Sequence, residues 1–119
     1  MKKALFSSAF AALALLAAVP MHAQSAAPLT VTALVENQTC ISKDFVQVTL
    51  SASATSDSQP VGFRWDFTND GKFDTSRSTE TSVVHVYADE SFVTAKVGAI
   101  NKMGQQAQDT VTISTLNCK

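Results

Sequence analysis

The sequence predicts an all-β protein, an antiparallel β-sandwich of about seven short strands preceded by an export signal. Beyond residue 23, apolar and polar residues alternate along several segments, which places the apolar side chains on one face of each strand. Turn-forming residues interrupt this alternation at intervals of about 8–12 residues, a spacing typical of sandwiches. No segment beyond residue 23 shows the period of about 3.6 residues that marks an amphipathic helix.

The first 23 residues have the layout of a secretory signal peptide. Lys2 and Lys3 form a basic start, and an uncharged run of 16 residues follows at Ala4–Val19. Pro20 then precedes small residues and a cleavage site after Ala23. The run is shorter than the about 20 residues that a membrane span needs. We therefore expect a secreted or periplasmic protein with a Sec-type signal of bacterial character, whose mature form has no membrane span.

Cleavage would leave a flexible lead at 24–30 and a single domain at 31–119. Removing residues 1–23 takes away two lysines and leaves 96 residues with 7 basic and 10 acidic side chains. This balance excludes the strongly basic class of nucleic-acid-binding domains, and the length excludes a two-domain enzyme. We expect a stand-alone domain.

A polar turn separates the first two expected strands. Leu29–Val35 is the first strand, and the polar residues at 36–39 predict a turn after it. Residues 46–52 alternate Val, Leu and Ala with Gln, Thr and Ser, which predicts a half-buried strand. The segment 53–60 is rich in Ser, Thr, Asp and Pro and predicts a loop.

The third expected strand carries three aromatic side chains on one face. Phe63, Trp65 and Phe67 alternate with Arg64 and Asp66. We expect the aromatic side chains in the core and the charged pair on the outer face. Sugar stacking would need an exposed Trp65, and the alternation favours the core.

Three further strands complete the expected sandwich. Segment 82–87 is a strand of ambiguous phase, because Val84 and Val86 compete with the residues between them for the inner face. Residues 93–99 and 110–114 alternate without this ambiguity, which predicts two more half-buried strands.

Cys40 and Cys118 are separated by 77 residues. An even number of cysteines after an export signal predicts a disulfide, whereas a redox-active pair normally lies closer, as in Cys-x-x-Cys. In an immunoglobulin-like sandwich, part of the first strand runs parallel to the last. Because each cysteine follows one of these strands, we expect the two to meet at one end of the sandwich.

Several short motifs occur in a characteristic order between residues 46 and 104. They are Val46–Asp57, Trp65-Asp66-Phe67 with Asp70-Gly71, His85-x-Tyr87 and Asn101-x-x-Gly104. In this order and spacing they resemble the PKD (polycystic kidney disease) domain. The resemblance covers about residues 33 to 116.

The resemblance implies an immunoglobulin-like sandwich of PKD type that serves extracellular proteins as a spacer or binding module. It also implies a structural role for the residues of the motifs. These are Trp65, Asp66, Phe67, Asp70, Gly71, His85, Tyr87, Asn101 and Gly104.

The segment from residue 66 to residue 74 has two interpretations. Side-chain oxygens fall at Asp66, Thr68, Asp70 and Asp74, with a glycine at the sixth position, which resembles the first part of a calcium loop. The glutamate expected at position 12 of such a loop is replaced by Arg77. The alternative is a β-turn in which the carboxylates accept backbone N–H groups. A structural calcium ion is therefore the one cofactor that the sequence suggests.

His85 is the only histidine beyond residue 23. One histidine cannot build a zinc site without other strong ligands, and no Gly-x-Ser-x-Gly elbow accompanies it. We expect a structural residue, with a small hydrolase using His85 and a serine as the remote alternative.

The alternation of inward and outward residues along the strands places the side chains of Arg64, Phe92 and Lys96 on the outer face of a sheet. An aromatic side chain among charges suits weak binding of a partner, and it also suits an ordinary surface.

The function that we expect is an exported, non-enzymatic binding or adhesion module without catalytic residues. It would recognise a polysaccharide, a wall component or an extracellular protein through a sheet face or loop. The alternative is a structural accessory subunit of a larger cell-surface or periplasmic assembly.

Overall fold

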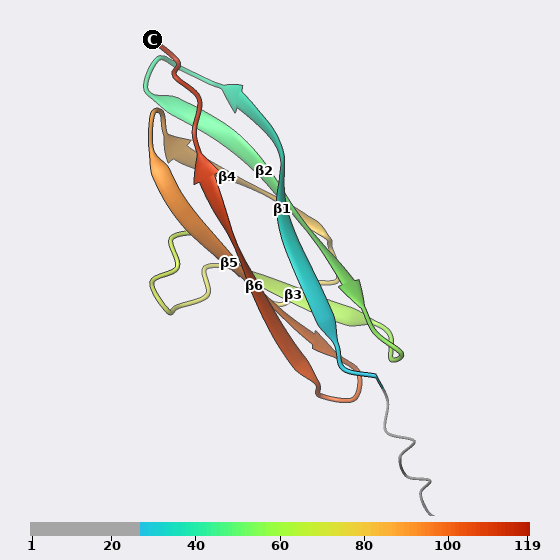
Figure 1. The fold of residues 1–119 in the computed structure, drawn as a ribbon. Helices are drawn as coiled ribbons and strands as arrows, with labels where there is room; N and C mark the ends of the chain where they lie inside the picture. Colours follow the sequence, from blue (N-terminus) through green and yellow to red (C-terminus); the bar gives the residue numbers. More distant parts are fainter. Residues whose placement is uncertain (1–26) are drawn as a thin grey trace, which may run out of the picture.

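The computed structural model describes residues 27–119, and these form six strands in two antiparallel sheets (Figure 1). One sheet has the order β1-β2-β4, and the other has the order β3-β5-β6. The predicted all-β antiparallel sandwich is confirmed; the expected signal peptide lies outside the described residues. The strands are β1 (Thr30–Cys40), β2 (Phe45–Thr55), β3 (Val61–Asp66), β4 (Ser82–Ala88), β5 (Phe92–Asn101) and β6 (Gln106–Ser114).

The core lies between the two sheets and follows the predicted alternation. Val48 and Leu50 of β2 are fully buried, as are Val97 of β5 and Ile113 of β6. Trp65 is 3% exposed and belongs to the core. Leu29, where the expected lead and the first expected strand overlap, is also buried there.

Strand β1 continues through the segment for which we predicted a turn, so the turn at 36–39 is wrong. The register with β2 shifts between Val35 and Asn37, which leaves Glu36 as the extra residue of a β-bulge. Beyond the bulge, Gln38 and Cys40 stand opposite inward-facing residues of β2. Polar residues are tolerated here because β1 is an edge strand of its sheet.

The pairing of β4 with β2 resolves the ambiguous phase. Tyr87, His85 and Val83 stand opposite the inward-facing Val46, Val48 and Leu50. The intervening Val84 and Val86 are exposed on the outer face of the sheet.

The connection from β3 to β4, residues 67–81, forms no named strand. It pairs with the sheet through an isolated antiparallel β-bridge between Ser78 and Phe63 of β3. The six strands correspond to the six segments in which the alternation predicted a strand, one fewer than the total of about seven expected for the sandwich.

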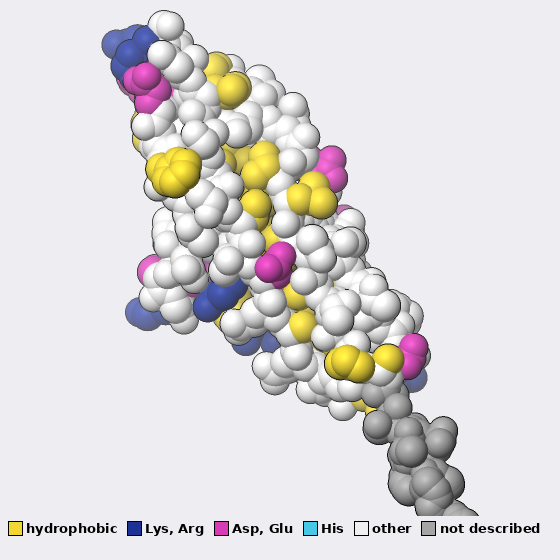
Figure 2. Space-filling view, in the orientation of Figure 1, with side chains coloured by type: hydrophobic (Ala, Val, Ile, Leu, Met, Phe, Trp, Pro, Cys, Tyr) yellow, Lys and Arg dark blue, Asp and Glu magenta, His cyan; other side chains and the backbone are white. Residues whose placement is uncertain are grey.

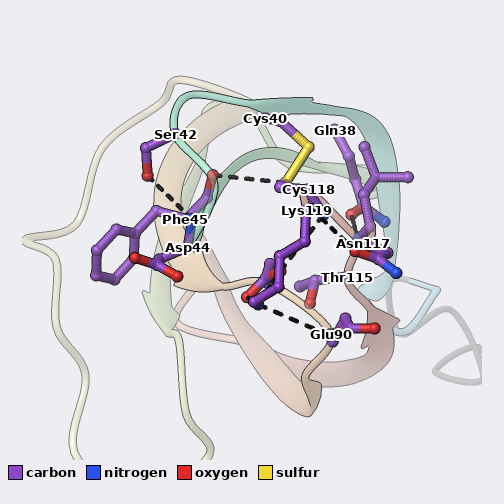
Figure 3. Close-up of a disulfide and its surroundings, with 12 residues drawn as sticks. Gln38, Cys40, Ser42, Asp44, Phe45, Glu90, Thr115, Asn117, Cys118 and Lys119 are labelled. Carbon is purple, nitrogen blue, oxygen red and sulfur yellow. Dashed lines mark hydrogen bonds and ion pairs between the residues drawn. A yellow bond between two sulfur atoms is a disulfide. The ribbon is translucent and has the colours of Figure 1, made fainter.

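Cys40 and Cys118 form the predicted disulfide, with 5.7 Å between their Cα atoms (Figure 3). Side-chain hydrogen bonds join β1 to β6, and in the two bonds that follow the partners are 76 residues apart in the sequence. The amide N–H of Ala33 donates to Asp109, and Gln38 donates to the carbonyl of Ser114. The two strands therefore run parallel, and the cysteines beyond them meet at one end of the sandwich, as expected.

Candidate binding face

The outer face of the β3–β5–β6 sheet carries the three residues of the predicted binding face. Arg64 lies on β3, and Phe92 and Lys96 lie on β5. Phe92 is 78% exposed, more than any other large hydrophobic side chain among residues 27–119. We call this surface, defined by Arg64, Phe92, Lys96, Gly98 and Ile100, the β5 face.

The β3–β4 connection folds back onto the β5 face (yellow-green in Figure 1). A Cβ atom on Gly98 would lie 2.9 Å from Cζ of Phe73, and one on Gly62 would lie 2.7 Å from Cγ of Arg77. Real Cβ atoms do not approach so closely. Glycine at these two strand positions therefore allows Phe73 and Arg77 to pack against the sheet.

Phe73 holds two cations of the β5 face. Cζ of Arg64 lies 4.0 Å from the centre of its ring, and Nζ of Lys96 lies 5.6 Å from it. Both distances are within the range of cation–π attraction. Among residues 27–119, ion pairs are formed by Lys119 with Asp89 and Glu90, so no carboxylate of this part of the chain pairs with Arg64 or Lys96.

The structure brings two of the three predicted face residues together and leaves the third apart. Arg64 and Lys96 share the ring of Phe73. Phe92 is four residues from Lys96 along β5, a separation of about 13 Å at about 3.3 Å per residue. Phe92 thus lies on the same face as the cation pair, but at the start of β5, whereas Lys96 lies in the middle of the strand.

Asp66 does not lie on the exposed face where we expected it with Arg64, because the connection covers it. It is fully buried, and its two carboxylate oxygens accept the N–H groups of Asp70 at 3.2 Å and Gly71 at 2.9 Å. Burial alone would raise the pKa of Asp66, but the N–H groups of Gly71, Asp70 and Thr68 favour the charged form and lower the pKa below its usual value.

The other acidic residues of the turn also accept backbone N–H groups. Asp70 accepts the N–H of Lys72 at 2.9 Å, and Asp74 accepts that of Phe67 at 2.8 Å. Within residues 27–119, no group of three or more His, Cys, Asp or Glu side chains is placed to hold a metal ion. The contacts fit the β-turn interpretation, and calcium binding at Asp66, Thr68, Asp70 and Asp74 stays the alternative interpretation.

His85 is packed between aromatic rings. Its ring stacks on Phe67 with 4.0 Å between centroids and meets Tyr87 edge-on at 4.7 Å. Burial lowers the pKa of His85 below its usual value, against the opposing effect of Asp74. These contacts suit a structural neutral imidazole, and no hydrogen bond joins it to a serine in the part of the chain that the structure describes.

Asn101 organises the turn between β5 and β6. Its Oδ1 accepts the N–H groups of Met103 and Gln105, and its Nδ2 donates to the side chains of Ser56 and Gln105. Gly104 has a φ of 85°, a conformation that favours glycine. The last two motif residues therefore shape one turn.

A model of the PKD domain family matches residues 25–115. The chain belongs to the PKD domain family. No curated protein matches it. PKD domains are non-catalytic, immunoglobulin-like modules of an extracellular binding or adhesion type, and the disulfide of this PKD domain fits an extracellular or periplasmic location. Residues 27–119 contain no helix of the length and apolarity needed to cross a membrane.

Sequence reasoning missed a cleft beside the β5 face of this PKD domain. The cleft has a volume of about 380 Å³. The signal that could have found it is the glycine at 62, inside β3, because such a glycine often marks a close approach of another chain segment. Residues that line the cleft include Pro60, Gly62, Arg77, Ile100 and Lys102.

Proposed function

We propose that this PKD domain is an exported, non-enzymatic binding module that recognises a polysaccharide, a wall component or an extracellular protein through the β5 face. The observation that carries the proposal is the pair Arg64 and Lys96 on the ring of Phe73. The ring keeps both cations close together, so less side-chain freedom is lost when a ligand binds. The exposed Phe92 extends the same face with an apolar contact.

The chemistry of the face suits binding without catalysis. Arginine and lysine supply hydrogen-bond donors to carboxylates or hydroxyls, and an exposed aromatic ring stacks on sugars or apolar side chains. His85, the candidate for a hydrolase, has both neighbouring rings packed against it. We further propose cleavage after Ala23 of a bacterial signal peptide, a mature form without membrane span, and no nucleic-acid partner.

Co-sedimentation of the purified protein with insoluble chitin, cellulose, peptidoglycan and collagen tests this function. We expect pelleting with at least one of them, weakened about tenfold or more by Arg64→Ala with Lys96→Ala, since a charged hydrogen bond is worth about 1.5–3 kcal/mol. Lys43→Ala, an exposed lysine of the β1–β2 turn, is the matched control and should bind normally.

Absence of pelleting in every arm would overturn the proposal. It would favour the accessory-subunit alternative, for which the opposite sheet offers the exposed side chains of Phe45, Val84 and Val86. Pelleting that survives the double substitution unchanged would move the binding surface away from the β5 face.

A further inference from the structure

The lining of the cleft beside the β5 face combines apolar side chains with two cations. Ile100 and Pro60 supply apolar surface, and Arg77 and Lys102 are exposed basic side chains on its walls. No Asp or Glu is among the residues that line it in the described part of the chain. Its volume of about 380 Å³ falls within the range of about 300–1,000 Å³ that is usual for ligand sites.

Arg77 connects this cleft with a second, smaller hollow. That hollow is lined by Arg64, Phe73 and Arg77, together with Gln106 and Gln108 of β6. Arg64, Arg77 and Lys102 therefore border one continuous surface. Figure 2 shows basic side chains around the β3–β4 connection, with acidic side chains beside them.

A cationic surface is unexpected in a domain whose net charge is negative. Residues 24–119 carry three more acidic than basic side chains. Within residues 27–119, no carboxylate forms an ion pair with Arg77 or Lys102, although Glu80 follows directly after Thr79 of the cleft lining. Both cations are therefore available to attract an anionic ligand.

The edges of the sheet argue against an extended peptide as that ligand. A peptide usually adds to a sheet through main-chain hydrogen bonds at an open edge. Ser78 already exchanges backbone hydrogen bonds with Phe63 on the β3 edge, and β6 lies against β1 on the other edge. Recognition here must come from side chains, and the amides of Gln106 and Gln108 suit hydroxyl groups.

We propose that the cleft beside the β5 face, together with the adjoining hollow, binds an anionic polysaccharide. Its carboxylate or sulfate groups would lie on Arg77 and Lys102 of the cleft, and its hydroxyls toward Gln106 and Gln108 of the hollow. This inference rests on the proposed binding function and names its ligand class. Arginine is suited to both anions because its planar guanidinium donates two parallel hydrogen bonds.

The test is titration calorimetry of the purified protein with polygalacturonate and with dextran sulfate. The first carries carboxylate groups and the second carries sulfate groups, so the comparison shows which anion is bound. Neutral dextran and poly-glutamate are the controls for charge and for a peptide. We expect one acidic polysaccharide to bind, more weakly in high salt because salt screens charges. Arg77→Gln with Lys102→Gln should weaken binding about tenfold or more, and Lys43→Gln should leave it unchanged.

Gly62→Ala tests the geometry while keeping every charge. Its Cβ would displace Arg77 from the strand, so we expect weaker binding although the net charge is the same. A urea unfolding curve shows whether this variant folds, and the Arg77→Gln with Lys102→Gln variant keeps the proposal testable if it does not.

Three results would overturn this inference. They are undiminished binding in the double variant, binding of poly-glutamate as tight as that of the polysaccharide, and absence of binding to both acidic polysaccharides. If both acidic polysaccharides fail while chitin or another solid ligand still pellets the protein through Arg64 and Lys96, the β5-face function stands and the cleft assignment falls. If no ligand binds in either experiment, both fall.

Discussion

Tyr87 of β4 donates its hydroxyl to the backbone carbonyl of Phe67 across 2.7 Å. The bond is buried and joins one sheet to the start of the connection that leaves the other. Burial, together with the negative charges of Asp74 and Asp66, raises the pKa of Tyr87 to about 12. The hydroxyl therefore stays protonated and remains a donor over the physiological range.

Tyr87→Phe should destabilise the domain by about 1–3 kcal/mol, because it leaves the buried carbonyl of Phe67 without its donor. The measurement is the free energy of unfolding in urea at pH 7. Phe92→Ala, at an exposed position, is the control and should change stability by no more than about 0.5 kcal/mol. Equal effects of the two substitutions would contradict the role given to the bond.

Asp66→Asn should lower stability at pH 7 by about 1–3 kcal/mol, since an amide cannot accept with both of its terminal atoms. The pKa of Asp66 is lower in the fold than its usual value of 3.8. The stabilisation by its carboxylate is therefore complete above that value and is lost as the pH falls through the folded pKa. We expect the difference between wild type and variant to narrow from pH 7 toward pH 2. A difference that stays constant would contradict this, and Asp44→Asn, at an exposed carboxylate, is the control.

His85→Phe should remove part of the pH dependence of stability near neutrality. The fold lowers the pKa of His85 below 6.5, so the unfolded chain takes up a proton first as the pH falls. Wild-type stability should therefore decrease from pH 7 through pH 6.5 toward the folded pKa, and the variant should lack this component. Parallel curves for the two proteins would show that burial does not disfavour the imidazolium.

Replacing Cys40 and Cys118 by serine should cost about 4–5 kcal/mol, according to the chain-entropy model for a loop of this size. The sequence separation of 78 means that the bond restrains nearly the whole unfolded domain. Urea unfolding of the double variant, compared with wild type under oxidising and reducing conditions, measures the effect. A loss below about 1 kcal/mol would contradict the entropic account.

The midpoint of thermal unfolding should be the same in calcium and in chelator. We expect this because Asp66, Asp70 and Asp74 already accept backbone N–H groups. A calcium-dependent rise in the midpoint that Asp74→Ala abolishes would instead establish the metal site.

Strand periodicity predicted the core, because each inward residue of β2 and β5 is followed by a polar or outward one. It could not predict the length of β1, since the Glu36 bulge changes which residues face inward and an edge strand accepts polar side chains. It also could not place Asp66. Local alternation puts that residue outside, and only the fold of the β3–β4 connection buries it.

The candidate site was predictable in part for the same reason. The alternation of residues along β3 and β5 placed Arg64, Phe92 and Lys96 on one face of the sheet. Phe73 and Arg77 reach this face from an irregular connection whose path no periodicity describes, and their contacts with Gly98 and Gly62 depend on tertiary packing.

The Cys40–Cys118 bond also determines how the domain carries mechanical load. Strand β1 starts at one end of the sandwich and finishes beside the C-terminus at the other (Figure 1). A force applied between residues 27 and 119 passes along β1 and then across the sulfur bridge, bypassing strands β2 to β6. Under tension only β1 can be drawn out, while every other strand stays inside a covalent loop that the force does not stretch.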